Sequence, residues 1–196
     1  MSEHFFPMIA RMRYITRWGL MRNTDPENIQ EHSHMVAVLA HALAVIQNEK
    51  FGGQVDPGAV AVAALYHDAH EIITGDLPTP VKYRSATLRD AYKAIEAESA
   101  AQMAALLPDE LEEEVLPYLT GNLLTAEERK ILKAADRLSA IIKCLEEARS
   151  GNHEFDSALR QQKEALKAMA CPEAAWFMEH CLPCYPQNLD ELTGQG

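Results

Sequence analysis

The chain of 196 residues is 47% hydrophobic and 7% aromatic, and its 18 basic and 29 acidic side chains give a formal net charge of −11. This charge, without any run of Lys and Arg, argues against nucleic acid or an anionic membrane as a partner. No apolar run approaches the ~20 residues of a membrane span and no signal-peptide pattern opens the chain, so we expect a cytoplasmic protein.

A chain of this length can bury a substantial core, because about 70% of the surface of the unfolded chain becomes buried on folding. We therefore expect one domain over residues 1–196, with its core at about 5–180 and a loosely held tail at 183–196. Ala and Leu are abundant and alternating β-branched runs are rare, which predicts an all-α fold. In chain order, we expect helices at 5–17, about 27–50, 57–74, 86–107, 108–119, 125–149, 153–170 and 172–178.

Local signals set several of these boundaries. Asp56 followed by Pro57 is typical of a helix start, and Thr125 with Glu128 fits a capping box. Two prolines within 76–80 prevent a regular helix, so we expect a loop there. Because this loop follows a dense apolar helix, it is well placed to contact a ligand.

Ionisable side chains interrupt the apolar stripes of three predicted helices. His32 lies in the stripe of the second helix, and Asp136 lies within an apolar run of the sixth. In the third helix, His67 and Glu71 share a face and Asp68 adjoins it. Buried alone, each such group is costly, but two imidazoles and two carboxylates together can neutralise a divalent cation. Ligands of this kind, without thiolate, suit Mn, Co, Fe, Ni or Zn.

Each of these residues also has an ordinary structural interpretation, as a buried His or an ion pair within the core. Their joint order on separate helices is what favours a metal site. His34 and His70 point away from the predicted core faces, so we expect them to contact solvent or to support the site indirectly. The four cysteines are expected to be reduced, and no function is assigned to the Cys181 and Cys184 pair.

The order of His32, His67-Asp68 and Asp136 resembles the H…HD…D signature of the HD-domain phosphohydrolases, an all-helical superfamily with a helical-bundle fold. More narrowly, nearly the whole chain is similar to the bacterial 5'-deoxynucleotidases. The segments that carry this similarity are Arg17-Trp18, Met21-Arg22-Asn23, Glu31-His32-Ser33, Tyr66-His67-Asp68-Ala69, Glu71, the run GDLPTPVKY from Gly75 to Tyr83, and the run KCLEE from Lys143 to Glu147. His70 departs from the pattern, where a small polar residue is expected.

The resemblance implies a phosphoric monoester hydrolase that releases phosphate from deoxyribonucleoside 5'-monophosphates with the help of one divalent metal ion such as Co, Mn or Zn. It implies little preference for the base and discrimination against ribonucleotides. It also implies a homodimer. Carried over by position, Glu71 is the catalytic residue. The implied metal ligands are His32, His67, Asp68 and Asp136, and the implied substrate contacts are Arg17, Trp18, His32, Asp76, Leu77, Pro78 and Thr79.

Two other interpretations remain open. The same metal site could serve another phosphoester, such as a cyclic nucleotide, a triphosphate or a guanosine polyphosphate. Longer phosphates favour more basic residues than Arg17, Arg22 and Lys82, so the sequence favours a monophosphate. The chain could also be a non-catalytic HD signalling module, but such a module typically lacks ligands or the catalytic carboxylate, and here all are present.

Overall fold

The structure is a computed structural model that describes residues 4–82 and 84–194. The described residues form helices joined by short loops, with one isolated antiparallel bridge between Thr16 and Asn28 in place of any sheet. The all-α, single-domain fold predicted from the sequence is confirmed. The helices are α1 Phe5–Ile9, α2 Ile29–Phe51, α3 Pro57–Tyr66, α4 Glu71–Thr74, α5 Thr79–Lys82, α6 Ala86–Ala104, α7 Asp109–Thr120, α8 Ala126–Arg149, α9 Asp156–Ala168, α10 Pro172–His180 and α11 Leu189–Leu192.

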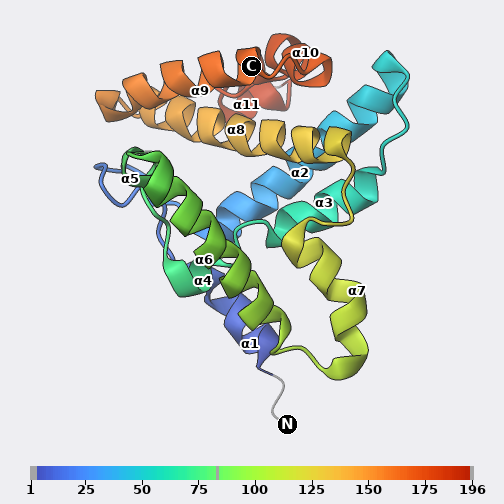
Figure 1. Ribbon diagram of the computed structural model, residues 1–196. Coiled ribbons are helices and arrows are strands. Elements are labelled where there is room, and N and C mark those ends of the chain that lie inside the picture. Colours follow the sequence, from blue (N-terminus) through green and yellow to red (C-terminus); the bar gives the residue numbers. More distant parts are fainter. Residues whose placement is uncertain (1–3, 83, 195–196) are drawn as a thin grey trace.

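The helices fall into two packed groups (Figure 1). In the first group, α2 packs against α3, α8 and α10, and α9 lies along α8. In the second group, α6 packs against α7, α4 and α1, and α7 also contacts α3. No helix within the described residues is long and apolar enough to cross a membrane.

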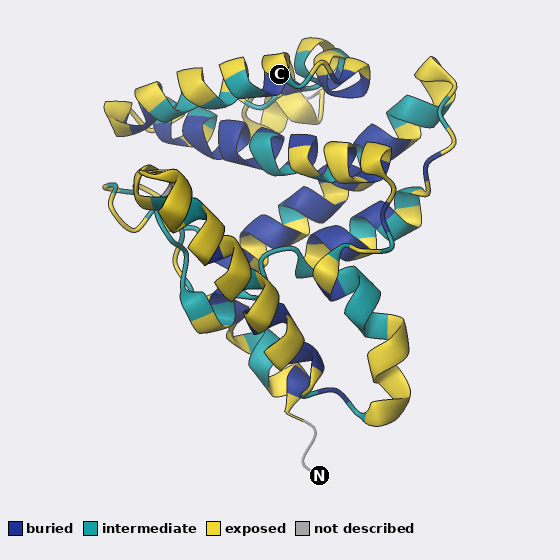
Figure 2. Ribbon diagram, in the orientation of Figure 1, coloured by how far each residue is buried: buried dark blue, intermediate teal, exposed yellow. Residues whose placement is uncertain are grey.

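Each group has its own apolar core, and both cores adjoin the segment that follows α3. The larger core lies between α2, α3, α8 and α10 and includes Leu43, Ile131, Leu138 and Phe177. The smaller core joins Phe5, Met103 and Leu119, among others, to Ala69 of that segment. Burial of one large aliphatic or aromatic side chain stabilises the fold by about 1.5–3 kcal/mol. The larger core thus fixes α3 and the smaller core fixes Ala69 of the segment that follows it, and the inward faces of α2 and α8 are buried (Figure 2).

The second helix begins two residues later than predicted. Asn28 is its N-cap, because the side-chain oxygen accepts hydrogen bonds from the backbone N–H groups of Gln30 and Glu31, both at 3.0 Å. Glu27 therefore precedes α2, and its side chain does not belong to the surface of that helix. The helix ends at Gly52, whose φ of 71° suits a residue without Cβ.

The predicted helix at 57–74 is broken, and this is the largest difference from the sequence analysis. Asp56 caps α3 as expected, but α3 ends at Tyr66 and a turn at 67–70 separates it from α4. Within this segment the backbone bonds connect residues three apart, as from Ala69 N–H to the Tyr66 carbonyl. Tight turns of this kind replace the α-helical pattern.

The first predicted helix, at 5–17, also ends early. After α1 the chain forms a 3-10 turn at Ala10–Tyr14 and then becomes extended. The extended part pairs with the chain that precedes α2, since Arg17 N–H donates to the Glu27 carbonyl at 2.9 Å and Ile29 N–H donates to the Ile15 carbonyl at 3.0 Å. This pairing competes with continuation of the helix.

Smaller differences concern loops and ends. One helical turn, α5, begins at the end of the predicted loop at 76–80 and runs to Lys82, because Pro80 lies in the first turn, where a missing N–H is tolerated. The helix expected at 86–107 ends at Ala104, and the one expected at 153–170 begins with a 3-10 turn at His153–Phe155. In the predicted tail at 183–196, Tyr185 is half-buried and the other described side chains are exposed. Tyr83 and the side chain of Thr79 lie outside the described part of the structure.

Candidate active site

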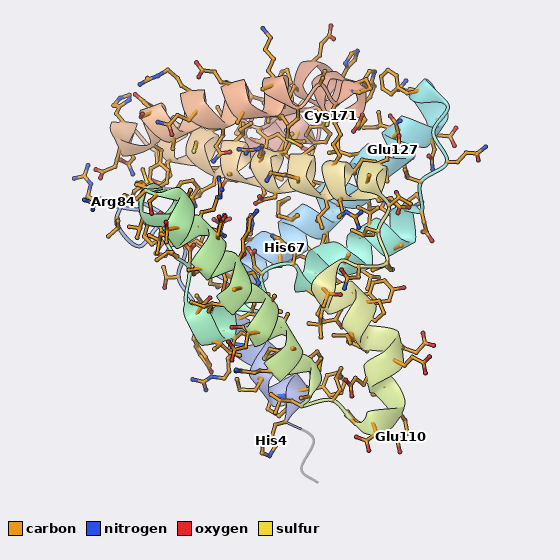
Figure 3. The ribbon with its side chains drawn as sticks, viewed as in Figure 1. His4, His67, Arg84, Glu110, Glu127 and Cys171 are labelled. Carbon is orange, nitrogen blue, oxygen red and sulfur yellow. The ribbon has the colours of Figure 1, made fainter. Side chains whose placement is uncertain are left out.

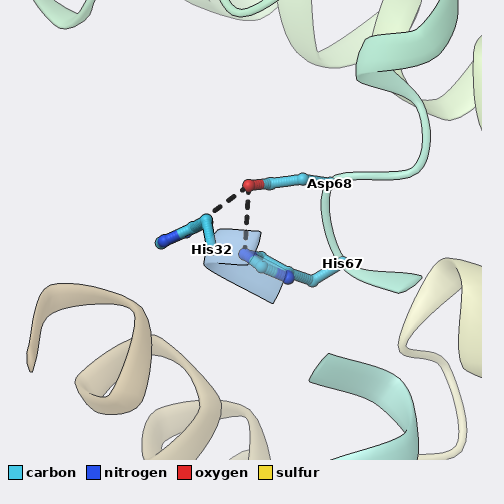
Figure 4. Close-up of side chains that lie close together, drawn as sticks. All are labelled: His32, His67 and Asp68. Atoms are coloured by element: carbon cyan, nitrogen blue, oxygen red, sulfur yellow. Dashed lines mark ion pairs between the residues drawn. The ribbon is translucent and has the colours of Figure 1, made fainter. Parts of the chain in front are cut away.

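Three of the four predicted metal ligands meet between α2 and the turn at 67–70 (Figure 4). His32 comes from α2, and its Nε2 lies 3.6 Å from Asp68 Oδ2. His67 Nε2 lies 3.2 Å from the same oxygen, and the two imidazole centres are 5.4 Å apart. One ligand atom of each residue lies within 4.8 Å of the others. The side chain of His32 is fully buried, and Figure 3 shows His67 in the interior, whereas His4 and Glu110 lie at the periphery.

The break after α3 is what lets His67 and Asp68 face the same point. In a continuous helix neighbouring side chains diverge by about 100°. In the turn, His67 Nδ1 lies 2.7 Å from the Ala64 carbonyl, which can only accept a hydrogen bond. Nδ1 therefore carries a proton, and the lone pair of a neutral imidazole is at Nε2.

His32 is held in a similar way from α8. Its Nδ1 lies 3.1 Å from the hydroxyl oxygen of Ser139, which is itself buried. Burial, together with the charge of Arg17, lowers the pKa of His32 and keeps the imidazole neutral. Ser139 was not singled out in the sequence, although its spacing of three from Asp136 places it on a neighbouring part of α8.

Asp136 approaches the cluster from α8 but remains more open. Its Oδ1 lies 3.2 Å from His32 Nε2, and 42% of its side chain is exposed. It is not one of the three residues whose ligand atoms lie within 4.8 Å of one another. Asp136 therefore sits between the buried group and the cavity outside it.

These residues fit a divalent cation. The Nε2 atoms of His32 and His67 are buried and have no hydrogen-bond partner among the described residues, although carboxylates lie within 3.6 Å. Two imidazole nitrogens beside two carboxylates form the mixed donor set that borderline metals prefer. Burial lowers the pKa of His67, but the charge of Asp68 and the hydrogen bond to it raise the pKa more, to about 9.

A second group, centred on Glu27, holds two predicted substrate contacts. Arg17 Nη1 lies 2.6 Å from Glu27 Oε2, and Trp18 Nε1 donates to the same oxygen at 3.1 Å. The backbone N–H of Trp18 donates to Asp76 Oδ2 at 3.3 Å. Burial alone would lower the pKa of Arg17, but the carboxylates around it, led by that of Glu27, raise it. Arg17 is thus a fixed cation beside the histidine and aspartate cluster.

Trp18 adopts a backbone conformation that is uncommon for a residue with a side chain. Its φ is 59°, in the left-handed region. The indole packs edge-on against Phe155 with ring centres 5.3 Å apart, and Arg17 lies over it at 5.6 Å. Contacts from three directions therefore fix Trp18, and strain held in this way is typical of ligand-binding positions.

Glu71 begins α4 and is 9% exposed, with its Oε2 buried and unpartnered among the described residues. Burial raises the pKa of its carboxyl to about 9, and Asp68 and Asp76 add to this effect. The residue before it, His70, has its Nε2 3.5 Å from Glu96 Oε1. The side chain of His70 is 15% exposed, which favours the second of the two expectations, indirect support of the site, whereas His34 is exposed.

A cavity of about 650 Å³ opens beside these groups, and its lining overlaps only in part with the predicted substrate contacts. Of the predicted contacts, His32 and Leu77 are not among the described residues that line it. The basic residues of the cavity also differ from those named in the sequence analysis. Lys133 and Arg137 line the cavity. Arg22 is exposed, and Lys82 Nζ lies 2.5 Å from Glu96 Oε1. The predicted residues in the lining are Arg17, Trp18, Asp76, Pro78 and Asp136, and the residues not predicted include Lys133, Arg137, Gln161 and Gln162.

Sequence reasoning missed Glu27 and Arg137 for different reasons. Glu27 looked like part of a helix, and only the folded chain shows that it precedes the N-cap. Arg137 follows a predicted ligand on an amphipathic helix, where a basic residue is usually a solvated one. Its approach to α9 depends on tertiary packing, which no local pattern in this sequence indicates.

Comparison with known proteins identifies the family of the chain. The family model described as 5'-deoxynucleotidase YfbR-like matches residues 4–185. A 5'-deoxynucleotidase of Vibrio parahaemolyticus is 44% identical over 192 residues, which cover 98% of this chain and 99% of that protein. A 5'-deoxynucleotidase of Photorhabdus laumondii is 46% identical over 191 residues, which cover 97% of each chain.

Solved structures show the same fold at lower identity. An HD-domain phosphohydrolase from Listeria innocua superposes with a TM-score of 0.80 at 21% identity, covering 97% of this chain and 92% of that one. The HD phosphohydrolase of cyanophage S-2L, bound to dA and one catalytic zinc ion, superposes with a TM-score of 0.63 at 23% identity, covering 90% and 95%. With the family match over most of its length, the chain belongs to the 5'-deoxynucleotidase YfbR-like family of HD-domain proteins.

Proposed function

We propose that this protein is a metal-dependent 5'-deoxynucleotidase, which hydrolyses deoxyribonucleoside 5'-monophosphates to deoxynucleosides and phosphate. The observation that carries the proposal is the buried group of His32, His67 and Asp68, with two unpartnered imidazole nitrogens, beside the fixed guanidinium of Arg17. Relatives with 44–46% identity over nearly their whole length bear the name 5'-deoxynucleotidase, which supports the same substrate class here.

His32, His67, Asp68 and Asp136 would hold one divalent ion, with Zn, Co and Mn as candidates. The HD phosphohydrolase of cyanophage S-2L, which has a related fold, is bound to one catalytic zinc ion, and this supports a metal-dependent activity. When bound, such an ion supplies Lewis acidity and a nucleophilic water at neutral pH.

Arg17 binds the phosphate in this proposal. Its guanidinium presents planar donors that match phosphate oxygens, and its ion pair with Glu27 keeps it in place before substrate arrives. Asp76, which already accepts the Trp18 N–H, has a second carboxylate oxygen that can accept the sugar 3'-hydroxyl. The rigid indole of Trp18 forms the wall that excludes a 2'-hydroxyl, since a steric clash discriminates more strongly than an open apolar pocket.

Glu71 transfers the proton. Burial raises the pKa of its carboxyl, and a carboxyl with a raised pKa suits donation of a proton to the leaving 5'-oxygen. The residue lies at the start of α4, close in sequence to the histidine and aspartate pair but separate from the ligand group.

The test is phosphate release after removal of metal by a chelator. Deoxy- and ribonucleoside 5'-monophosphates are assayed with Zn, Co, Mn or Mg restored, alongside a deoxynucleoside triphosphate and a cyclic nucleotide. Release from the deoxynucleoside monophosphates alone, dependent on metal, is the expected result. Preference for the triphosphate or the cyclic nucleotide would show that the proposed substrate is wrong. No phosphate release from any of these compounds would contradict the proposal as a whole.

The proposal includes a homodimer, as the family resemblance in the sequence implies, and a cytoplasmic location, as expected from the sequence pattern. Light scattering on the purified protein is expected to give twice the mass of one chain. A mass equal to one chain at micromolar concentration would remove the dimer from the proposal without affecting the activity. Cell fractionation tests the location.

A further inference from the structure

The helix α6 presents two polar side chains to the part of the chain that carries the proposed sugar contact. Tyr92 and Glu96 are four residues apart, so they lie on the same face of α6. The helix packs against α4 and α5 (Figure 1), the two short helices that begin and end the segment at 71–82. Asp76 lies between those two helices. The proposed metal, phosphate and proton-transfer groups include neither Tyr92 nor Glu96.

Tyr92 contacts the segment directly before Asp76. Its hydroxyl lies 3.3 Å from Thr74 Oγ1 and 3.4 Å from the Gly75 carbonyl oxygen, and it can donate to either. The Thr74 hydroxyl itself donates to the Gly75 carbonyl at 3.0 Å. Tyr92 is 7% exposed, yet within the described ranges it is not among the residues of the two apolar cores. Its polar contacts with the segment therefore distinguish it from an ordinary core aromatic.

Gly75 is the residue from which Asp76 extends, and its backbone is unusual. Its φ of 70° and ψ of 164° lie in a region that is essentially restricted to glycine and that persists only when the surroundings hold it. The Gly75 N–H donates to the Glu71 carbonyl at 2.8 Å. The Gly75 carbonyl belongs to the same planar peptide group as the Asp76 N–H. A hydrogen bond from Tyr92 to that carbonyl therefore orients the start of Asp76.

The other end of the segment is tied to the same face of α6. Lys82, the last residue of α5, has its Nζ 2.5 Å from Glu96 Oε1 and 4.7 Å from the centre of the Tyr92 ring. The two charged side chains are 26% and 22% exposed, so salt screens this pair less than one at the open surface. Burial raises the pKa of Glu96, but its contacts with His70 and Lys82 lower it more. The helix thus holds the segment on both sides of Asp76.

We propose that Tyr92, supported by the pair of Glu96 and Lys82, is a positioning residue that sets the Asp76 carboxylate for the sugar 3'-hydroxyl. The inference rests on the proposed function, in which Asp76 accepts that hydroxyl. One oxygen of Asp76 is engaged by the Trp18 N–H at 3.3 Å, so the direction of the other oxygen depends on the backbone at Gly75.

The proposed role has a specific kinetic signature. A segment that is restrained before substrate arrives loses less entropy on binding, which improves affinity. The 3'-hydroxyl does not react, so its contact with Asp76 is the same in the ground state and in the transition state. Loss of such a contact raises KM and leaves kcat unchanged.

The test compares dAMP with 2',3'-dideoxyadenosine 5'-monophosphate, which lacks the 3'-hydroxyl, in metal-loaded wild type and Tyr92→Phe. The substitution removes one hydroxyl and keeps the ring beside Lys82. In Tyr92→Phe, KM for dAMP is expected to rise about three- to tenfold, the worth of one hydrogen bond, with kcat retained. Both constants for the dideoxy compound are expected to stay unchanged. Tyr14→Phe, at an exposed position, is the matched control and is expected to follow the wild type.

A second variant tests the other end of the segment. Glu96→Gln weakens the pair with Lys82, so it is expected to raise KM for dAMP with the same selectivity. Metal content is measured on the same preparation, because His70 also contacts Glu96 and adjoins the turn that carries the proposed ligands. Glu98→Gln, at an exposed position of α6, is the control.

A binding measurement keeps the inference separate from the proposed hydrolysis. Calorimetry with deoxyadenosine and 2',3'-dideoxyadenosine measures the 3'-hydroxyl contact without turnover. The wild type is expected to bind deoxyadenosine more tightly, and Tyr92→Phe is expected to reduce this difference. The comparison retains its meaning even if the protein hydrolyses neither monophosphate.

Three outcomes would overturn the inference. A preference for the 3'-hydroxyl that survives intact in Tyr92→Phe and Glu96→Gln would show that α6 does not position Asp76. An equal fall in kcat for both monophosphates in Tyr92→Phe would show that the hydroxyl supports α4 and Glu71 instead. Equal KM values and equal binding of the paired compounds by the wild type would remove the 3'-hydroxyl contact itself, while hydrolysis of dAMP would leave the proposed activity standing.

Discussion

At the scale of single residues, the carboxylate of Glu27 links two parts of the proposed site. One of its oxygens contacts both the Arg17 guanidinium and the Trp18 indole N–H. A carboxylate that accepts from two donors restricts both side chains before substrate arrives, and such restriction lowers the entropic cost of binding.

Glu27→Gln is expected to lower kcat/KM for deoxynucleoside monophosphates about tenfold or more. The substitution keeps the size of the side chain but removes the charge that orients Arg17, and charge-assisted hydrogen bonds are about twice as strong as neutral ones. Steady-state phosphate release measures the effect. Glu49→Gln, at an exposed position of α2, is the control, and equal kinetics in the two variants would show that Glu27 does not position Arg17.

Glu71→Gln is expected to reduce kcat by at least about a hundredfold with the bound metal retained, because proton transfer by a positioned side chain typically contributes this much. Kinetics and metal analysis of the same preparation measure the two properties. Full turnover in this variant would assign the proton transfer to another group, and loss of metal would place Glu71 among the ligands.

Trp18→Ala is expected to reduce the preference for deoxyribo- over ribonucleotides by about tenfold or more, because the cavity then has room for the 2'-hydroxyl. The measurement is the ratio of kcat/KM for dGMP and GMP. Phe155→Leu serves as the companion variant, since it loosens the edge-on packing of the indole without removing it. An unchanged ratio in Trp18→Ala would exclude the indole from sugar selection.

At the scale of elements, the sequence predicted helices more reliably than the places where they break. Asp56 and Thr125 cap α3 and α8 as expected, because capping depends on residues next to the helix end. The break at 67–70 was missed, because the apolar periodicity continues through it. His67 and Asp68 were nevertheless predicted as ligands, since their chemistry can be recognised without knowledge of the backbone, and the structure brings them together with His32.

A buried carboxylate in α8 holds the segment before α2. Glu147 is 1% exposed at its side chain, pairs with Lys143, and accepts from the backbone N–H groups of Thr24 and Asp25 and from Asn152. Burial raises its pKa, but these partners outweigh that effect and bring the pKa down to about 2. The network connects α8 to the chain that runs from Trp18 to Glu27, and it therefore helps to fix the Glu27 group.

The depressed pKa of Glu147 predicts how stability depends on pH. A carboxyl with a lower pKa in the folded state stabilises the protein above its unfolded value of about 4.5, and the contribution is lost as the pH falls toward 2. Glu147→Gln is expected to lower the free energy of unfolding by about 3 kcal/mol at pH 7 and by progressively less below pH 4.5.

Urea unfolding at several pH values measures this difference. Glu113→Gln, at an exposed position of α7, is the control and is expected to follow the wild type at every pH. A difference between wild type and Glu147→Gln that stays constant from pH 7 to pH 3 would contradict the depressed pKa.

At the scale of the whole molecule, the ligand cluster joins elements that are far apart in the sequence. His32 and Asp136 come from α2 and α8, and Asp68 comes from the turn between the two cores. The amino-acid pattern identified these residues because costly groups stood in apolar stripes. It could not supply Arg137 with Gln162, or Glu27 with Trp18, because those contacts form only when the helices and loops have packed.

Metal is therefore expected to stabilise the folded chain as a whole. At a free metal concentration of about 100 times Kd, binding to the folded state alone adds about 2.7 kcal/mol, which raises Tm by roughly 5–10 °C for a domain of this size. Thermal unfolding with and without chelator measures the shift. Asp68→Asn is expected to abolish it, whereas Asp90→Asn, at an exposed position of α6, is expected to keep it. An equal shift in Asp68→Asn would place the metal elsewhere.

The distribution of the ligands along the chain has a consequence for synthesis on the ribosome. His32, His67 and Asp68 leave the exit tunnel well before α8, which carries Asp136 and the Ser139 that holds the His32 ring. Until α8 emerges, the apolar face of α2 that it covers in Figure 2 is open to water and to other nascent chains. The proposed metal site can therefore form only late in translation. A pause in translation before α8 would leave the chain open to aggregation while the set of proposed ligands is still incomplete.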